Sequence, residues 1–305
     1  MKAEYFCLCM SPALDASVTL PAWPSDGVIF KDVVETENVG GKGINVARWL
    51  ALRGAEVACG GLLGEDNAVP FEQELSRCGI RDAFLRVPGA TRRNEMIVTP
   101  QGSFKLNRPA FPKLPAEFDA LKAIQAVDGF KDLKGSPHVA ILSGSLPPAV
   151  PKDFYAEAIR ALKAQGWTVA LDASGEALRL GVEAGPDLIK PNADECEPLV
   201  GFVPKTPDDF RRATAILNER VPHAIISDGG AGAWFDGEFV AAPQVDARDT
   251  TSAGDTLLAE FCWRRWSGGT DAARWAVAAG SAAVTMPGSV PPPAELVKRL
   301  KENMK

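Results

Sequence analysis

The sequence predicts an α/β fold, in which a mainly parallel central sheet is covered by helices on both faces and carries a small additional β-sheet. Apolar runs of strand length alternate with segments of helical period, a pattern typical of parallel strands joined by helices. Two irregular stretches, at 17–39 and 84–107, interrupt the alternation. With 305 residues, 46% of them hydrophobic, the chain can bury a large core.

The regular elements follow one another along the chain. Strands are expected at 4–10, 57–63, 138–143, 168–173, 186–191 and 224–228. Helices are expected at 43–52, 70–79 and 152–165, and in the C-terminal part at 253–266, 271–284 and 293–303. The two irregular stretches have the composition of short strands joined by Pro and Gly turns, so we expect them to form the small sheet together.

Charge and hydropathy exclude several classes of partner. The formal net charge of −6 gives no basic surface for displacing counterions from nucleic acid. No run of about 18 apolar residues is present, and the apolar run near the N-terminus is too short for a secretory segment. We therefore expect a cytoplasmic protein with neither a nucleic-acid nor a membrane partner.

Cysteine and histidine chemistry are also disfavoured. The six cysteines include no Cys-x-x-Cys pair. Cys7 and Cys9 share one face of an expected strand and should lie in the core, with a metal on the two thiols as the weaker alternative. His138 and His223 each open an apolar run, which is not typical of catalytic histidines.

The segment DTTSAGDTLLAEF at 249–261 contains an acidic residue in the first turn of an expected helix. Small residues before that turn let backbone N–H groups approach an anion, and the helix dipole adds positive potential. Asp255 is placed to take a proton from a hydroxyl that attacks a phosphate. Stabilisation of the helix N-terminus alone explains Asp255 equally well.

Three further segments resemble phosphate- or nucleotide-binding turns. NVGGKGINVARWL at 38–50 has three bare glycines before a helix, but it lacks the spacing of a Walker A loop, and a plain glycine turn remains an alternative. In KPNADECEPL at 190–199, Asn192 and Glu195 can orient Mg²⁺ or water, or they can simply cap a helix. SDGGAGAWF at 227–235 suits a turn against a nucleotide or a hairpin.

A set of cations and amides occupies the second irregular stretch. The residues are Arg92, Arg93, Lys105, Arg108, Asn94 and Asn107. Most are expected to form a solvated face. One or two arginines are candidates for clamping a phosphate on the substrate, because a guanidinium binds phosphate in bidentate fashion.

In this order along nearly the whole chain, the motifs resemble those of the ribokinase-like (PfkB) carbohydrate kinases, in the branch of 1-phosphofructokinase and tagatose-6-phosphate kinase. The similar segments are SPALDASV at 11–18, VGGKGINVAR at 39–48, SGSLPPAVP at 143–151, LDASGEAL at 171–178, IKPNADE at 189–195 and TTSAGDT at 250–256. The resemblance implies one three-layer α/β/α domain, 1–305, with a β lid formed by insertions at about 13–39 and 84–110. Lids of this family often make homodimer contacts.

The resemblance also implies ATP, Mg²⁺ and a set of site residues. It implies Asp255 as catalytic base and the amides of Ala253, Gly254 and Asp255 as the anion hole, with Ser252 beside them in the catalytic segment. The sugar-phosphate site would contain Asp15, Gly40, Gly41, Lys42, Asn45, Arg92, Arg93, Ser143 and Ser145, with Arg92 a better phosphate ligand than Arg93. The nucleotide site would contain Lys190, Asn192, Ser227, Gly229, Gly232, Thr251, Ala279 and Ser281. Mg²⁺ would lie near Asn192 and Glu195, held through water or ATP phosphates.

Two departures from the family pattern affect the functional interpretation. Ser252 replaces a glycine of the usual Gly-Ala-Gly-Asp, and a positive φ there would cost about 1–2 kcal/mol. FKLNRPA at 104–110 places Lys105 and Arg108 where the branch usually has glutamates. The leading interpretation is ATP-dependent phosphorylation of a phosphorylated ketose, fructose 1-phosphate or tagatose 6-phosphate. The alternatives are a kinase of an unphosphorylated sugar or nucleoside, and a catalytically silent sugar-phosphate-binding regulator.

Overall fold

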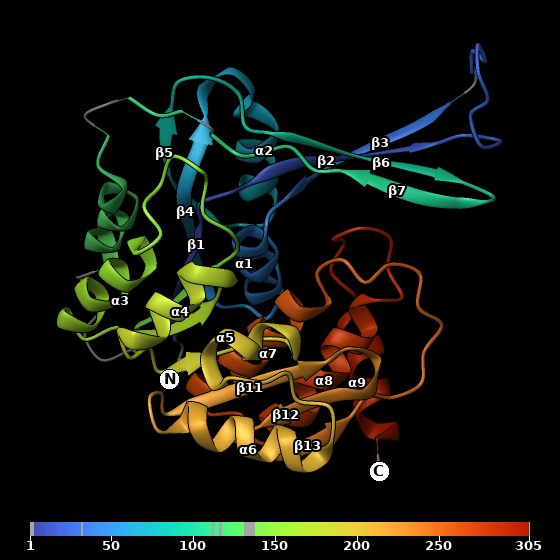
Figure 1. The fold of residues 1–305 in the computed structure, drawn as a ribbon. Helices are drawn as coiled ribbons and strands as arrows, with labels where there is room; N and C mark the ends of the chain where they lie inside the picture. The colour runs from blue at the N-terminus through green and yellow to red at the C-terminus, as the bar shows by residue number, and fades with distance from the viewer. Residues whose placement is uncertain (1–2, 32, 112, 116–117, 131–137, 305) are drawn as a thin grey trace.

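The computed structural model describes residues 3–31, 33–111, 113–115, 118–130 and 138–304. The described residues therefore leave out residue 32, which belongs to the first expected insertion, and residues 1, 2 and 305 at the ends of the expected domain. Within them, two sheets and their helices form a main body and a projecting arm (Figure 1). No described helix combines the length and the apolar character needed to cross a bilayer.

The main sheet has the strand order β13-β12-β11-β10-β9-β8-β1-β4-β5 in the described part of the chain. Its strands are β1 (Glu4–Cys9), β4 (Glu56–Gly64), β5 (Arg81–Val87), β8 (His138–Ser143), β9 (Thr168–Asp172), β10 (Leu188–Ile189), β11 (His223–Asp228), β12 (Gly232–Phe235) and β13 (Glu238–Ala241). Pairing is parallel from β11 to β5, and β12 and β13 add antiparallel strands at the other edge. The expected mainly parallel sheet is confirmed.

Helices cover both faces of this sheet. They are α1 (Lys42–Leu52), α2 (Val69–Arg77), α3 (Phe154–Ala164), α4 (Gly175–Glu183), α5 (Glu197–Val200), α6 (Pro207–Asn218), α7 (Ala253–Trp266), α8 (Ala272–Ala283) and α9 (Ala294–Asn303). Short 3₁₀ segments lie at Glu65–Asn67, Ala120–Phe130, Asp194–Cys196 and Gly229–Ala231.

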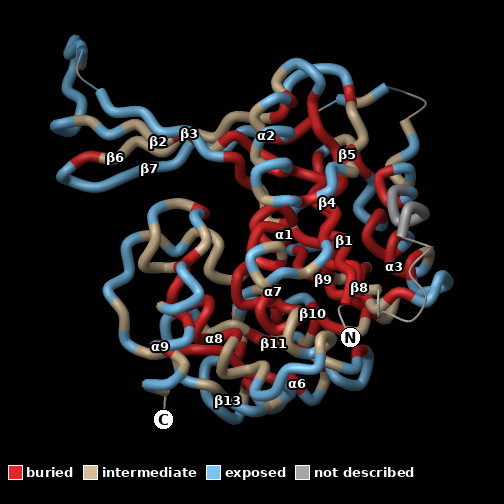
Figure 2. The backbone as a smooth tube through the Cα atoms, turned by 180° about the vertical axis from the view of Figure 1, so that it is seen from behind, coloured by how far each residue is buried: buried red, intermediate tan, exposed pale blue. Residues whose placement is uncertain are grey.

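Strand β1 runs through the middle of the core, and its side chains alternate between two hydrophobic layers. Tyr5, Cys7 and Cys9 pack with residues of α1, α2, α7, α8 and α9. Phe6 and Leu8 pack with residues of α3, α4 and α6 on the opposite face. Every residue of β1 is buried, as the continuous buried colour along the central strands shows (Figure 2). The three-layer α/β/α fold and the core position of both thiols are thus confirmed.

The arm is a four-stranded sheet of order β3-β2-β6-β7. Its strands are β2 (Ala13–Thr19), β3 (Val34–Gly40), β6 (Arg93–Thr99) and β7 (Gly102–Leu106), with β2 and β6 parallel and the outer pairs antiparallel. Much of its surface is exposed (Figure 2). We call it the lid.

The second lid insertion begins later than the sequence indicates. Residues 84–87, expected in the lid, belong to β5, which pairs in parallel with β4 at the edge of the main sheet. The Pro-Gly pair that separates the main sheet from the lid lies after residues 84–87, because Pro88 and Gly89 turn the chain from β5 toward the lid. The turn at 227–235 is a hairpin between β11 and β12.

Candidate active site

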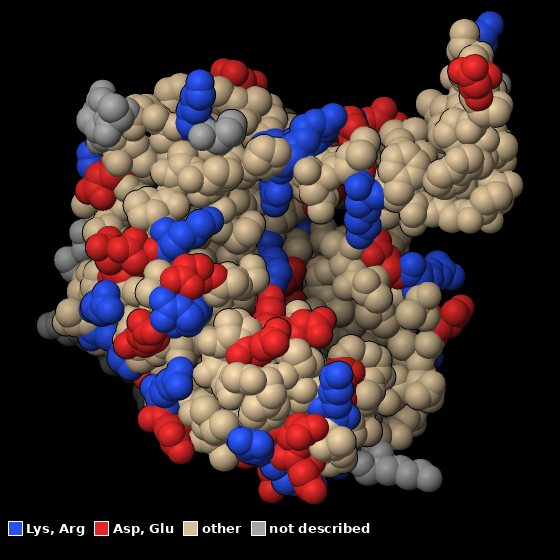
Figure 3. Space-filling model, in the orientation of Figure 1, with Lys and Arg blue, Asp and Glu red and all other residues tan. Residues whose placement is uncertain are grey.

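A cavity of about 310 Å³ lies at the carboxyl ends of the central strands, below the lid. Its lining residues are Cys9, Ser11, Gly41, Lys42, Arg92, Ser143, Gly144, Ser145, Ala173, Ser174 and Glu195. Cys9 and Ser143 end β1 and β8, and Ala173 follows β9. The space-filling view shows the front of the molecule hollowed beneath the lid, with acidic and basic side chains in the hollow (Figure 3). Open α/β sheets bind ligands at this end of their strands.

Two glycines bring the first turn of α1 against the end of β1. Gly41 has a φ of 121°, and a Cβ there would lie 2.7 Å from Sγ of Cys9. A Cβ on Gly43 would lie 2.6 Å from the carbonyl oxygen of Leu8. Only glycine permits this approach, and it places Lys42 and Asn45 over the site.

Asp255 lies in the first turn of α7 and is 4% exposed. Nδ2 of Asn45 donates to its Oδ2 at 2.8 Å. Burial raises the pKa of Asp255 above its usual value, and nearby Asp172 adds to the rise, while Lys42, Lys190 and the Asn45 hydrogen bond oppose it. Asp255 is thus a carboxylate with increased proton affinity that is still surrounded by groups favouring its charge.

The start of α7 has the geometry of an anion site. The amides of Gly254 and Asp255 belong to the first turn and have no acceptor within the helix, whereas the amide of Ala253 donates to the carbonyl of Thr250 at 3.5 Å. Ser252 precedes the helix with φ 64° and ψ 0°, so the position does require the left-handed conformation. The expected backbone strain at this serine is confirmed.

Asp172, at the end of β9, is a site residue that the sequence analysis missed. It is fully buried between Lys42, whose Nζ lies 3.2 Å from Oδ1, and Lys190, whose Nζ lies 3.3 Å from Oδ2. Burial alone would raise the pKa of Asp172, but the two ammonium groups hold it below its usual value. Burial lowers the pKa of Lys42, but Asp172 and Asp255 together raise it by more, and the resulting pKa is about 12.

The two lysines point positive charge toward the helix start. A Cβ on Gly254 would lie 3.3 Å from Nζ of Lys190, so the ammonium faces the first turn of α7. Lys190 is 4% exposed, while the side chain of Lys42 is 42% exposed and lines the cavity. Phosphate oxygens in this region would meet two cations. The sequence does contain a feature that could have identified Asp172, because this acidic residue ends the strand-like run TVALD at 168–172.

Asp15 lies at the base of the lid, with Asn38 on β3 and Asn94 on β6 directly beside it in register. Nδ2 of Asn94 donates to Oδ1 of Asp15 at 2.8 Å. A Cβ on Gly40 would lie 1.9 Å from Oδ2 of Asp15, so this glycine makes room for the carboxylate. Burial raises the pKa of Asp15. Asp15, Asn38 and Asn94 together provide the hydrogen-bond acceptors and donors that sugar hydroxyls require.

Arg92 and Arg93 have different surroundings. Arg92 lines the cavity and donates to the carbonyl oxygens of Ser11 and Arg108, at 3.2 and 3.0 Å, so neutral acceptors hold it and its charge is not neutralised by them. Arg93 forms ion pairs with three glutamates of the lid, namely Glu35, Glu37 and Glu95. Arg92 is therefore the arginine available to an anion in the cavity.

Ser143 and Ser145 also line the cavity. Ser143 is fully buried, and its Oγ has no hydrogen-bond partner among the described residues. A buried hydroxyl without a partner is costly unless a ligand supplies one. It therefore fits a polar ligand in this cavity.

Asn192 and Glu195 form a reciprocal cap. The amide of Glu195 donates to Oδ1 of Asn192 at 2.8 Å, and the amide of Asn192 donates to Oε2 of Glu195 at 2.9 Å. The capping interpretation is thus confirmed, and it leaves Glu195 in the cavity wall. In the described part of the chain no group of three or more His, Cys, Asp or Glu side chains is arranged for a metal. This donor set fits Mg²⁺ held mainly by nucleotide phosphates and water.

The expected nucleotide-site residues are dispersed around the C-terminal half of the body. Ser227 lies at the end of β11 beside Asn192, and Gly229 lies in the exposed turn that follows. Ser281 on α8 is 9% exposed. Two other residues have packing roles: Ala279 is fully buried in the core, and a Cβ on Gly232 would lie 2.1 Å from the carbonyl oxygen of Val240.

Thr251 connects the helix start to the lid. Its Oγ1 donates to Asp249 at 2.6 Å and accepts from Nζ of Lys105, on β7, at 3.2 Å. The lid segment that departs from the family pattern thus touches the loop before α7. The second cation of that segment, Arg108, pairs with Glu95 within the lid.

Comparisons with known proteins agree with this geometry. Residues 27–295 match the family model described as pfkB family carbohydrate kinase. The chain is 33% identical over 269 residues to the 1-phosphofructokinase of Vibrio cholerae, covering 86% of this chain and 83% of that protein. It is 35% identical over 268 residues to the 1-phosphofructokinase of Rhodobacter capsulatus, covering 85% and 83%. Phosphofructokinase-2 from Escherichia coli, solved in complex with substrates and products, superposes with a TM-score of 0.86 at 26% identity, over 99% of both chains.

Proposed function

The chain belongs to the pfkB family of carbohydrate kinases, and from this premise we propose that it transfers the γ-phosphoryl group of ATP to a hydroxyl of fructose 1-phosphate. Family and relatives together identify an ATP-dependent kinase of a phosphorylated sugar. The observation that carries the proposal is a cavity whose lining includes both Arg92 and Lys42, together with the buried Asp255, which interacts electrostatically with Lys42. It offers charge for a substrate phosphate and a base for a hydroxyl.

Asp255 is the proposed base. Its raised pKa favours proton transfer from a hydroxyl, while Asn45 and the lysines favour its ionised form. The amides of Gly254 and Asp255 and the ammonium of Lys190 would stabilise charge on the transferred group. Activity is expected to fall as the pH decreases through the pKa of Asp255, because the protonated carboxyl cannot accept a proton.

Arg92 is the proposed ligand of the substrate's own phosphate. It reaches the cavity with a guanidinium bonded to carbonyl oxygens, which do not cancel its charge. Asp15 and Asn94 would bind sugar hydroxyls. An unphosphorylated sugar would leave Arg92 facing an empty phosphate subsite.

ATP would extend from the start of α7 toward Ser227, Gly229 and Ser281. When bound with the nucleotide, Mg²⁺ supplies charge neutralisation of its phosphates. The residues proposed near it are Asn192, whose Nδ2 can donate to a phosphate oxygen, and Glu195, whose Oε1 can accept a hydrogen bond from metal-bound water, since the cap uses only Oδ1 of Asn192 and Oε2 of Glu195. Lys190 and Thr251 complete this part of the site.

A homodimer formed through the lid is also proposed. Three of the large apolar side chains exposed on the lid are Trp23, Phe104 and Leu106, at 50, 38 and 47%, and the rings of Trp23 and Phe104 pack edge to face with their centroids 5.6 Å apart. Phe104 and Leu106 point to the same side of β7 because they are two residues apart on a strand. Such a patch on a projecting sheet is suited to burial against a second copy.

The test is ADP release from ATP and Mg²⁺, with fructose 1-phosphate compared with tagatose 6-phosphate, fructose 6-phosphate, fructose and adenosine. The wild-type chain should turn over fructose 1-phosphate fastest, and Asp255→Asn should lower kcat by about 10²- to 10⁴-fold. Asp208→Asn is the matched control, since Asp208 also lies in the first turn of a helix but its side chain is 95% exposed. Turnover of free fructose alone, or an active Asp255→Asn, would refute the proposal.

A further inference from the structure

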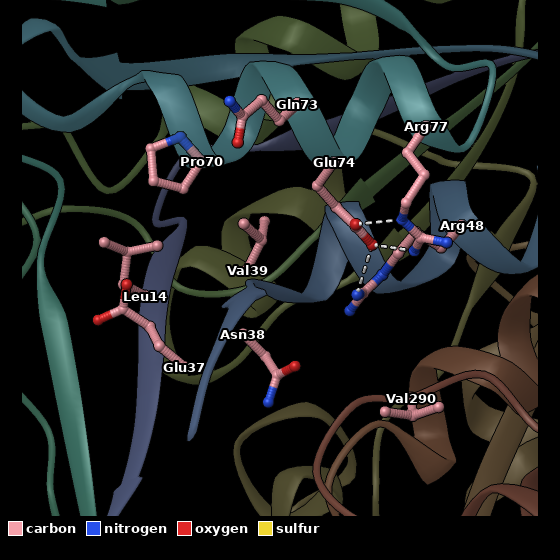
Figure 4. A pocket seen from close by; sticks show the side chains of 10 residues that line it. All are labelled: Leu14, Glu37, Asn38, Val39, Arg48, Pro70, Gln73, Glu74, Arg77 and Val290. Atoms are coloured by element: carbon pink, nitrogen blue, oxygen red, sulfur yellow. Dashed lines mark hydrogen bonds and ion pairs between the residues drawn. The ribbon is translucent and has the colours of Figure 1, made fainter. Parts of the chain in front are cut away.

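Arg48 is a buried arginine one helical turn beyond Asn45 on α1, 5% exposed. Its Nη2 donates to Oδ1 of Asn45 at 2.8 Å, and to Oγ and the carbonyl oxygen of Ser289 at 2.9 and 3.1 Å. Its Nη1 donates to Oε1 of Glu74 at 3.1 Å. Figure 4 shows Glu74, on α2, held by Arg48 and Arg77 at the wall of a cavity of about 360 Å³. Arg48 therefore joins α1 to α2 and to the loop before α9.

The contact with Asn45 determines how that amide is turned. An asparagine side chain has one accepting oxygen and one donating nitrogen, and a guanidinium only donates. Because Arg48 holds Oδ1, Nδ2 faces the opposite side, where it donates to Asp255. We propose that Arg48 is a positioning residue: it sets the orientation of Asn45 and so keeps a hydrogen-bond donor on the catalytic carboxylate. The inference rests on the proposed role of Asp255 as base.

The groups around Asp255 define what this orientation contributes. Lys42 faces Asp255 from α1, Lys190 from the segment after β10, and Asp172 from the end of β9. The lysines and the Asn45 donor favour the ionised carboxylate, whereas Asp172 disfavours it. Were the amide reversed, its oxygen would face the carboxylate and repel it.

Arg48 acts through the amide, because its two Nη atoms donate to Asn45, Ser289 and Glu74, and its buried Nε has no partner among the described residues. When Arg48 is replaced by Met, Glu74 keeps its ion pair with Arg77, in which Nε of Arg77 lies 2.9 Å from Oε2 of Glu74. Glu74 on α2 is therefore not left without a cation. The freed amide of Asn45 then turns between two orientations. The fraction of molecules with a donor on Asp255 decreases, and the pKa of that carboxyl rises.

A double-mutant cycle tests the proposal, with kcat measured against pH for the full chain on ATP and fructose 1-phosphate. Arg48→Met and Asn45→Ala should each lower kcat by about 10- to 100-fold and move the acidic limb of the pH profile to higher pH. The double variant should be no slower than Asn45→Ala, because Arg48 acts through Asn45. Arg77→Met is the matched control: it removes the other arginine on Glu74 and should leave kcat and the pH profile unchanged.

Multiplicative losses in the double variant, or an unshifted pH profile for Arg48→Met, would overturn the inference. Asn45→Asp provides a second test in case Arg48→Met does not fold, since the two side chains have the same shape. With Arg48 holding one oxygen, the other would face Asp255, so Asn45→Asp should be slower than Asn45→Ala; a faster Asn45→Asp contradicts the proposed orientation. If the wild-type chain is inactive on ATP and fructose 1-phosphate, the proposed function fails and this inference fails with it. If the wild type is active but the effects of the two substitutions on the activation free energy add up, only this inference fails.

Discussion

Asp172→Asn tests the charge arrangement beneath the cavity. The substitution keeps the shape of the side chain but removes the charge that balances Lys42 and Lys190, whose ammonium groups lie 3.2 and 3.3 Å from its two oxygens. The two lysines then lose the carboxylate with which they form ion pairs, and only the charge of Asp255 and, for Lys42, of Glu195 remains nearby. Lys42 can turn toward solvent because 42% of its side chain is exposed, but Lys190 cannot, because only 5% of its side chain is exposed.

The expected destabilisation is therefore that of one buried cation left unpaired. Removing one partner of a buried ion pair costs about 3–5 kcal/mol, and we expect the lower end because Lys42 escapes to water. For a chain of this length, about 3 kcal/mol corresponds to a decrease in Tm of about 5 °C. The variant should also lose activity, since both lysines are directed at the proposed phosphate positions.

The assay is thermal unfolding at pH 7 and in acid, with Asp228→Asn as control. Asp172 has a lowered pKa in the folded chain, so it contributes stability above its unfolded pKa of about 3.9 and loses it as the pH falls through the folded value. The Tm difference from wild type should be full at pH 7 and shrink in acid. Burial raises the pKa of Asp228, so its neutralisation should not destabilise. A Tm at pH 7 equal to that of the wild type for Asp172→Asn would refute the reasoning.

Two further predictions concern the lid. Arg92→Ala should raise KM for fructose 1-phosphate by about 10- to 100-fold, because a charge-assisted contact with the substrate phosphate is lost. Arg93→Ala only removes the partner of lid glutamates and should leave KM nearly unchanged. If the two substitutions have equal effects, the substrate phosphate binds elsewhere. Leu106→Asp should convert a dimer to a monomer in sedimentation experiments, whereas Leu52→Asp, at an exposed leucine of α1, should not. A wild-type chain that sediments as a monomer contradicts the proposed dimer.

The sequence predicted the main body well because its strands are continuous apolar runs. It also led to Asp255, Lys42 and Asn45, since small residues and glycines before helices mark turns where backbone approaches a ligand. The lid boundary was wrong at 84–87, where the partly buried edge strand β5 of the main sheet has the same mixed composition as a lid strand. Local composition does not distinguish the two, because the difference lies in which strand each one pairs with.

Residues that act through long-range contacts were harder to find. Arg48 follows Asn45 by three positions, but its partners Glu74 and Ser289 come from distant segments, and only the fold reveals that it is buried. Asp172 was part of a quoted motif, yet its role depends on two lysines 130 and 18 positions away. The family resemblance favours Arg92 over Arg93 as the phosphate ligand, and this ranking stays a prediction. The structure adds a physical reason for it, because lid glutamates neutralise Arg93.

The two buried carboxylates of the site differ in a way that supports their proposed roles. Asp172 and Asp255 are both nearly inaccessible to water, and burial alone would raise the pKa of each. Asp172 lies in ion-pair contact with two ammonium groups and stays ionised, whereas Asp255 receives one amide hydrogen bond and keeps a raised pKa. Environments that push the pKa values of neighbouring acids apart separate a fixed charge from a proton acceptor. On this argument Asp172 holds the lysines, and Asp255 is the carboxylate left to take the proton.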